Sequence, residues 1–170
     1  MVRYFFIILL ANSFINLNAQ DSIVKKNTAY FEVGGSGLLY SVNYDRLLLV
    51  DKKMRFSLTA GTWYIPHIES ISDFNYMLGT SIGVNTLFGK QKHFAEFGVN
   101  VAYMIMNDID DSMYQLIYLP FRIGYRYQKD TGGLFLRAAF IPIVPIFQDA
   151  DVAIFFPVSP HFSLGAGYSF

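Results

Sequence analysis

The sequence predicts an all-β protein: a transmembrane antiparallel up-and-down β-barrel of eight strands, preceded by a cleaved signal peptide. The chain of 170 residues is 53% hydrophobic and 18% aromatic, but only 15% charged, against roughly 25% in ordinary soluble domains. Beyond residue 20 it has no apolar run long enough for a membrane helix. Its apolar residues instead alternate with small or polar ones, which is the two-residue period of a β-strand.

The first twenty residues are typical of a secretory signal. Arg3 gives a positive start, residues 4–11 (YFFIILLA) are apolar, and the more polar stretch that follows ends in the small residue Ala19. We therefore predict cleavage after Ala19. The expected organisation is a signal peptide at 1–19, a short periplasmic segment at 20–27 and the barrel at 28–170.

The rest of the chain divides into eight alternating segments separated by clusters of Gly, Asp, Asn and Lys. Most are about ten residues long, which is the ~9–11 residues that a tilted strand needs to cross a bilayer. The stretch Gly34-Gly35-Ser36-Gly37 is either a tight outer turn or a bulge within one long strand. The second interpretation gives an odd count unless 144–160 holds another strand. The predicted strands are 28–34, 38–48, 54–65, 76–88, 93–105, 114–127, 133–143 and 161–170.

The two faces of these segments differ in an informative way. In 114–127, Phe121 and Ile123 lie opposite Arg122 and Gly124. A soluble sandwich or a lipocalin-like barrel alternates too, with its apolar face inward. Here, however, the polar face is rich in Gly, Ser and Asn with isolated Arg and Glu, which favours the crowded interior of a narrow membrane barrel.

Charge asymmetry predicts the topology. The short connections at 49–53, 89–92 and 128–132 contain lysines, whereas the long connections contain Asp and Glu without Lys or Arg. Short periplasmic turns with longer outer loops are the pattern of outer-membrane barrels, so we expect the cell outer membrane as the location. The long connections are 66–75, 106–113 and 144–160.

Several charged residues fall on the inward face of the predicted strands. Isolated charges in an enclosed lumen are costly unless paired, and the Arg fork binds carboxylates at two points. We predict a luminal charge network that fills the barrel, with Glu96 beside Arg122 to within about two residues of strand register and Arg122 near Arg137; a narrow ion path is the alternative. The predicted network is Glu32, Asp45, Arg55, Glu96, Arg122, Arg126 and Arg137.

No cofactor or metal site is predicted. The chain has no cysteine, and its 13 basic and 13 acidic residues cancel, so it lacks the basic excess of a nucleic-acid binder. The acidic stretch 107–112 lacks the Gly and the distal Glu of a helix-loop-helix calcium site. His161 and Ser163 share the inward face and could act as base and nucleophile. They partly resemble the His-any-Ser-Asn motif of the outer-membrane lipid A deacylase, but Leu164 stands in place of the Asn.

The end of the chain resembles the C-terminal insertion signal of bacterial outer-membrane barrels, which has a polar residue, a Gly and two aromatic residues at set positions. Ser163, Gly165, Tyr168 and Phe170 match those positions. The barrel region as a whole resembles small eight-stranded barrels such as the membrane domain of outer-membrane protein A. The stretches LLYSVNYDR (38–46), HFAEFG (93–98) and IGYRYQ (123–128) also resemble a family of small Gram-negative barrels without an assigned activity.

These resemblances imply partners but no mechanism. They imply contact with outer-membrane lipid and lipopolysaccharide, and recognition of the C-terminal strand by the barrel-assembly machinery. The sequence therefore predicts a non-enzymatic barrel with a side-chain-filled lumen and a structural or interaction role through its extracellular loops. A small gated pore and a lipid-modifying enzyme that uses His161 and Ser163 are the alternatives. The apolar connection 143–160 is a candidate contact surface.

Overall fold

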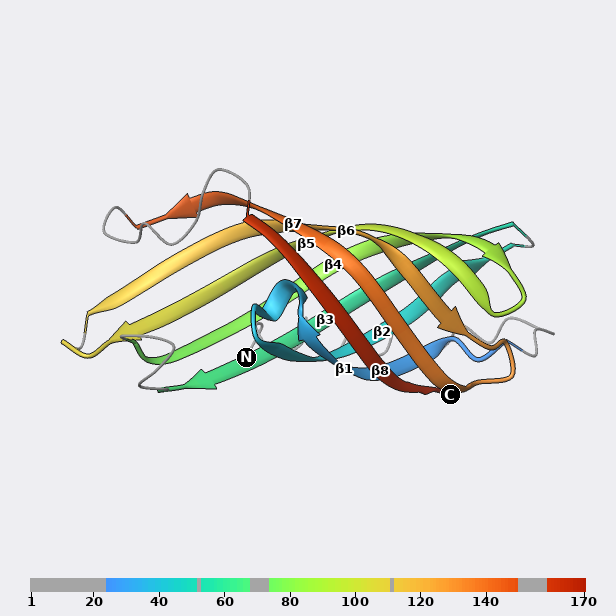
Figure 1. The fold of residues 1–170 in the computed structure, drawn as a ribbon, viewed down its shortest axis with the longest axis horizontal. Coiled ribbons are helices and arrows are strands. Elements are labelled where there is room, and N and C mark those ends of the chain that lie inside the picture. The colour runs from blue at the N-terminus through green and yellow to red at the C-terminus, as the bar shows by residue number, and fades with distance from the viewer. Residues whose placement is uncertain (1–23, 52, 68–73, 111, 150–158) are drawn as a thin grey trace, which may run out of the picture.

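The chain folds into a closed barrel of eight antiparallel strands in the order β1 to β8, with β8 pairing back onto β1 (Figure 1). The computed structural model describes residues 24–51, 53–67, 74–110, 112–149 and 159–170, so the predicted signal peptide lies outside the described residues. No helix in the described ranges is long and apolar enough to cross a membrane. The strands are β1 Asn27–Gly34, β2 Tyr40–Val50, β3 Met54–Pro66, β4 Phe74–Lys90, β5 His93–Asp108, β6 Met113–Gln128, β7 Gly133–Gln148 and β8 Ser159–Ser169.

The eight predicted strands are confirmed, with one substantial difference in length. β7 continues through Pro142 and Pro145 to Gln148, whereas the sequence predicts its end at residue 143. Proline lacks a backbone N–H and is normally found at strand edges or bulges, which is why these prolines suggested a loop. Residues 144–148 therefore extend β7, and residues 150–158 lie outside the described part of the chain.

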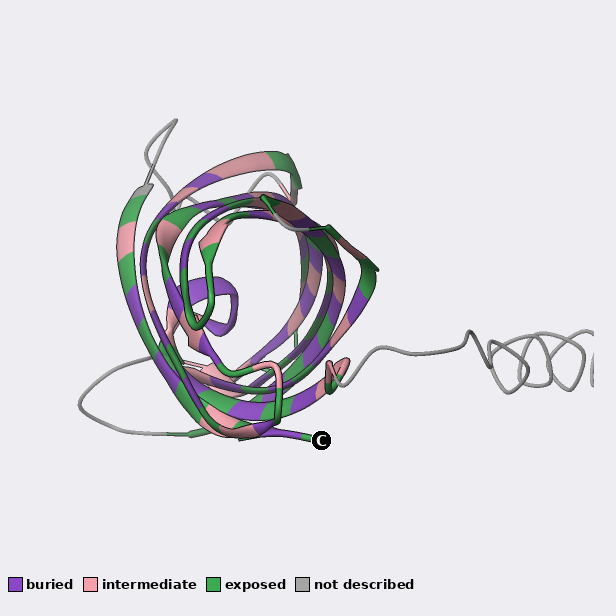
Figure 2. Cartoon of the chain, turned by 90° about the vertical axis from the view of Figure 1, so that its right-hand side faces the viewer, coloured by how far each residue is buried: buried purple, intermediate pink, exposed green. Residues whose placement is uncertain are grey.

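β1 and β2 are separate strands, and the turn between them lies inside the barrel. This turn is the short 3-10 helix η1, Gly35–Gly37, whose three residues are all buried. Gly34 and Gly35 have φ angles of 74° and 71°, in the left-handed region that glycine tolerates best. Figure 2 shows the coil within the ring of strands, and in Figure 1 it lies near the middle of the barrel's length. Of the two interpretations that the sequence left open, the turn is therefore observed and the bulge is not; the turn folds into the interior of the barrel.

The two ends of the barrel differ. One end, which we call the turn end, carries the short connections β2–β3, β4–β5 and β6–β7 and the C-terminal residue Phe170. The opposite loop end carries the longer connections after β3, β5 and β7 (Figure 1). At the turn end Asn27 and Phe170 exchange two backbone hydrogen bonds of 3.1 and 2.8 Å, which complete the closure between β1 and β8.

Alternation along each strand separates the two faces of the wall. Large apolar side chains point outward and are exposed, for example Phe162 at 75% and Leu164 at 69%. Charged and polar side chains of the same strands point inward and are buried, among them Arg126, Asp45 and Glu96. The interior of this barrel thus holds buried charged side chains and its outer wall exposes large apolar ones, the reverse of an ordinary soluble protein.

Candidate functional site

The lumen is filled in layers. Nearest the turn end is a small apolar layer of Leu47, Leu87 and Phe94. The charged network follows, and then the inward turn η1. The half of the lumen between η1 and the loop end is lined by a larger apolar cluster that includes Trp63, Met104 and Ile141.

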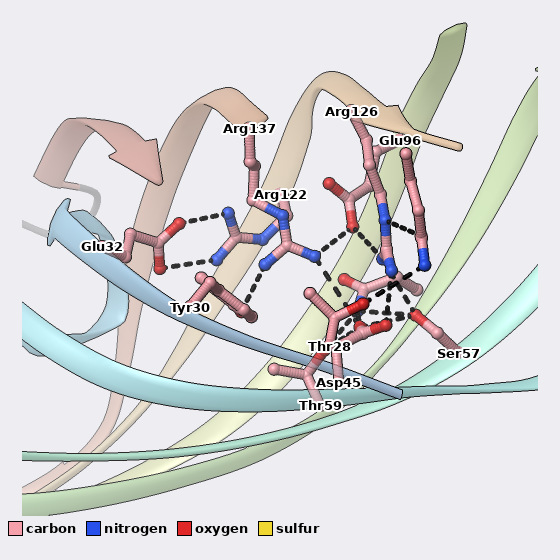
Figure 3. Close-up of polar contacts among 12 residues, drawn as sticks. Thr28, Tyr30, Glu32, Asp45, Ser57, Thr59, Glu96, Arg122, Arg126 and Arg137 are labelled. Atoms are coloured by element: carbon pink, nitrogen blue, oxygen red, sulfur yellow. Dashed lines mark hydrogen bonds and ion pairs between the residues drawn. The ribbon is translucent and has the colours of Figure 1, made fainter. Parts of the chain in front are cut away.

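All seven residues predicted for the luminal network lie on the inward face. Each of these residues is at most 7% exposed. The two-residue period of a strand fixes this placement, because once one residue of a strand faces inward, every second residue does so too. Six of the seven converge in the middle of the lumen (Figure 3). Arg55 lies at the turn end, near the start of β3.

Glu32 and Arg122 form one unit of this network. Arg122 donates from Nη1 to Glu32 Oε1 at 2.6 Å and from Nη2 to Glu32 Oε2 at 3.1 Å. A two-point pair of this kind is among the strongest protein ion pairs. It links β6 to β1 across the lumen, next to η1 on its turn-end side.

The second unit joins two carboxylates to two guanidinium groups. Arg126 Nη2 lies 2.5 Å from Asp45 Oδ1, and Arg137 Nη2 lies 2.6 Å from Glu96 Oε1. Longer contacts cross-link the pairs, with Arg126 3.5 Å from Glu96 and Arg137 3.8 Å from Asp45. The side chains therefore form a closed four-membered cluster that ties together β2, β5, β6 and β7.

The predicted contact between Glu96 and Arg122 is wrong. Glu96 lies opposite Gly124 in the β5–β6 ladder, two positions from both Arg122 and Arg126. Arg122 is bound by Glu32 from β1, so Glu96 pairs with Arg126 and Arg137 instead. Arg137 lies directly opposite Arg126 in the β6–β7 ladder. Strand-by-strand reasoning placed Glu32 in the network but did not assign it to Arg122.

Neutral side chains that the sequence analysis did not single out complete the cluster. Ser57 and Thr59 donate to Asp45 Oδ2 at 2.8 and 2.6 Å. Gln128 accepts from Arg126 Nε at 2.9 Å, and the Tyr30 hydroxyl accepts a short hydrogen bond from Arg137. Each lies at an inward position of its strand, so the alternation that located the charges also marked these residues.

Arg55 is paired outside this cluster. Its guanidinium lies 2.7 Å from Asp130 Oδ1, in the β6–β7 turn, and 4.4 Å above the ring of Phe94. Asp130 was not predicted as a partner because it lies in a connection and no strand alternation applies to it. The pair covers the turn end of the lumen.

The central network is balanced in charge. Glu32, Asp45 and Glu96 supply three carboxylates, and Arg122, Arg126 and Arg137 supply three guanidinium groups. Burying an ion without a partner costs several kcal/mol, so this balance is what allows the charges to occupy an enclosed lumen. The arrangement fills and cross-links the barrel.

Ser163, Gly165 and Tyr168 of the predicted insertion signal lie along β8, and Phe170 follows its last residue. Tyr168 and Phe170 are exposed on the outer wall, whereas Gly165 and Ser163 face inward. Ser163 Oγ accepts a hydrogen bond of 3.4 Å from Arg122 Nη1. Its neighbour on the inward face, His161, is only partly buried. The candidate nucleophile thus lies against the Glu32–Arg122 pair.

Within the described ranges, no three His, Cys, Asp or Glu side chains come together in a way that would hold a metal ion. No protein-family model matches the chain, and no curated protein matches it significantly. The resemblance to small outer-membrane barrels therefore stays a prediction from the sequence.

Proposed function

We propose that the chain is an outer-membrane β-barrel protein of a Gram-negative bacterium. The observation that carries the proposal is the inverted distribution of side chains on the closed barrel. Exposed apolar residues such as Val84, Phe97 and Leu136 surround the wall, and the ion pairs lie inside. Such a wall would be unstable in water, but in a bilayer it contacts acyl chains at no cost.

Two further features support export and insertion. The first nineteen residues are typical of a secretory signal. The C-terminal strand carries an exposed terminal aromatic residue, Phe170, at the position expected of the signal that the barrel-assembly machinery recognises. On this proposal the outer wall contacts phospholipid and lipopolysaccharide, and the turn end faces the periplasm.

We propose a structural or interaction role without enzymatic activity. The lumen is obstructed at three successive levels: the apolar layer around Phe94, the ion-pair network and the η1 turn. Interior side chains of an eight-stranded barrel are expected to fill it, which disfavours a diffusion pore. On this proposal, partners would bind at the loop end of the barrel.

The location and the sealed lumen have separate tests. The protein should fractionate with the outer membrane, and its folded form should migrate faster on gels than its heated form. The purified protein should give no single-channel conductance in planar bilayers. Steady channels in the wild-type protein would contradict the sealed lumen, and recovery in the soluble fraction would contradict the location.

A third test addresses the enzymatic alternative. The wild-type protein should release no fatty acid from phospholipid or lipopolysaccharide. Hydrolysis that is lost in both His161→Ala and Ser163→Ala would contradict the proposal and favour a lipid-modifying enzyme. The gel-mobility assay would show whether either variant had lost activity only because it failed to fold.

A further inference from the structure

The two ends of the barrel carry charge of opposite sign. The long connections of the loop end contain acidic residues and no Lys or Arg. At the turn end the acidic groups of the described residues are Asp51, Asp130 and the terminal carboxylate of Phe170, and lysines outnumber them. The described lysines at this end are Lys25, Lys26, Lys53, Lys90, Lys92 and Lys129.

Three of these lysines gather at the β6–β7 turn. Lys129 belongs to the turn itself, and Lys92 of the β4–β5 turn lines with it a pocket of about 300 Å³. Lys25 arrives from the segment before β1, where its backbone N–H donates to the Asp130 carbonyl at 2.7 Å. Its side chain lies against Gly132 of the same turn, so closely that a side chain on Gly132 would collide with it. Three segments far apart in the sequence thus bring three lysines to one turn.

The carboxylate that lines this pocket is already paired. Asp130 Oδ1 lies 2.7 Å from Arg55 Nη1, so the two charges cancel. Among the described residues, the ion pairs involve none of the three lysines. The lysines therefore leave a positive potential at the pocket, which attracts anions. The neutral residues of its lining, Gln91 and Thr131, add an amide and a hydroxyl that can donate hydrogen bonds.

The pocket lies where the turn end meets the outer wall. The Lys92 ammonium is 5.7 Å from the centre of the Tyr127 ring. The exposed His93 packs against Tyr127 and Tyr125, with ring centres 5.6 and 5.9 Å apart, and Tyr125 is exposed on the outer wall. Tyrosine is enriched at the interface between a membrane and water, because its ring is apolar and its hydroxyl is polar. A bilayer around the wall would therefore place lipid headgroups at the level of the pocket.

From this arrangement we propose that the pocket between the β4–β5 and β6–β7 turns binds the phosphate headgroup of an anionic phospholipid of the periplasmic leaflet. The ammonium groups of Lys92 and Lys129 contact the phosphate, and Lys25 adds positive charge beside the turn. The acyl chains lie along the outer wall next to Tyr125. A soluble anion would meet only the lysines, whereas a phospholipid also contacts the apolar wall. This inference rests on the proposed membrane location and orientation.

Native mass spectrometry of the purified protein in a neutral detergent measures the binding. The protein is titrated with dioleoylphosphatidylglycerol or with dioleoylphosphatidylcholine, which have the same acyl chains and differ in headgroup charge. The anionic lipid should bind saturably and at a lower concentration, and added salt should weaken its binding. Equal binding of the two lipids would overturn the proposal.

Paired substitutions distinguish a pocket from diffuse attraction to the basic end. Lys92→Gln with Lys129→Gln should raise the half-saturating concentration of phosphatidylglycerol about tenfold to thirtyfold, since one lysine near an anionic lipid contributes about fivefold. Lys92→Arg with Lys129→Arg keeps the charge and should keep the binding.

The matched control is Lys26→Gln with Lys53→Gln, which removes the same charge from the β2 side of the turn end, where the Lys26 carbonyl accepts from the Leu47 N–H. It should change the half-saturating concentration less than about twofold. Gel mobility identifies the folded variants. Equal weakening by the two glutamine pairs would show attraction to the whole end and overturn the pocket.

Competition with inorganic phosphate distinguishes a lipid from a free anion. At matched ionic strength, phosphate should displace no more phosphatidylglycerol than chloride does. Greater displacement by phosphate would assign the pocket to a soluble anion and contradict the proposal. These measurements use purified protein in detergent, so their failure is distinct from failure of the fractionation test of location.

Discussion

Arg122 and Glu32 are 90 positions apart in the sequence, yet they form a two-point ion pair across the barrel, with N–O distances of 2.6 and 3.1 Å. The pair joins the sixth strand to the first, which share no ladder. It lies next to η1 on its turn-end side, where Gly35 approaches the Glu32 carboxylate. This contact therefore fixes the distance between facing walls at the level where the chain turns inward.

The Arg122–Glu32 pair should behave as a coupled unit in a double-mutant cycle. Glu32→Gln alone leaves a buried guanidinium without its carboxylate, a loss of about 3–5 kcal/mol. Arg122→Met alone leaves the reverse defect. The double variant removes both charges, so it should be more stable than the sum of the two losses predicts. Urea denaturation of the protein in micelles measures all three, and strictly additive losses would show that the pair is not coupled.

Glu96 should matter more to stability than an acidic residue in a loop. Glu96→Gln removes the acceptor shared by Arg137 and Arg126, so two buried cations lose one counter-ion and the free energy of unfolding should fall by about 3–5 kcal/mol. Asp110→Asn, at an exposed site in the β5–β6 connection, is the control and should change it by less than about 0.5 kcal/mol. We expect the urea midpoint to separate the two variants, and equal midpoints would contradict the assigned role of Glu96.

Loss of Phe170 should reduce assembly. Its backbone exchanges two hydrogen bonds with Asn27 at the junction of β1 and β8, and its ring is exposed on the outer wall. Deleting it should lower the amount of folded protein in the outer membrane, as measured by heat-modifiable gel mobility. Phe170→Tyr, which keeps an aromatic ring at the end of the chain, should retain assembly. An unchanged folded yield after the deletion would remove the basis for the insertion signal.

The two barrel ends should lie on opposite sides of the membrane. Lys90 is exposed at the turn end, and Asp110 is exposed at the loop end. In the cysteine-free chain, Asp110→Cys should react with a membrane-impermeant thiol reagent added to intact cells, whereas Lys90→Cys should react only after the outer membrane is permeabilised. The opposite labelling pattern would invert the proposed orientation.

The sequence by itself determined the features that depend on local alternation. Side chains of a strand point to opposite faces with a period of two, so most of the strands, the apolar outer wall and the inward position of residues such as Arg126 and Asp45 follow from spacing alone, whereas the division of 28–48 into two strands did not. The length and charge of the connections also distinguished the two ends of the barrel, because the short connections contain lysines and the long ones contain acidic residues. The inward neutral residues Ser57 and Thr59 were equally accessible to this reasoning.

Only the tertiary structure decided which inward groups meet. Closure of the barrel and the stagger of its strands set the distances across the lumen, and neither quantity is encoded in a single hairpin. For this reason Glu96 binds Arg137 and Arg126 instead of Arg122, Glu32 reaches Arg122 from the far wall, and Asp130 covers Arg55 from a turn. The inward fold of η1 has the same origin. Gly34 and Gly35 permit a tight turn in either direction, and it is the contacts of Ser36 with Tyr118 and Asn100 on the opposite wall that hold it within the barrel.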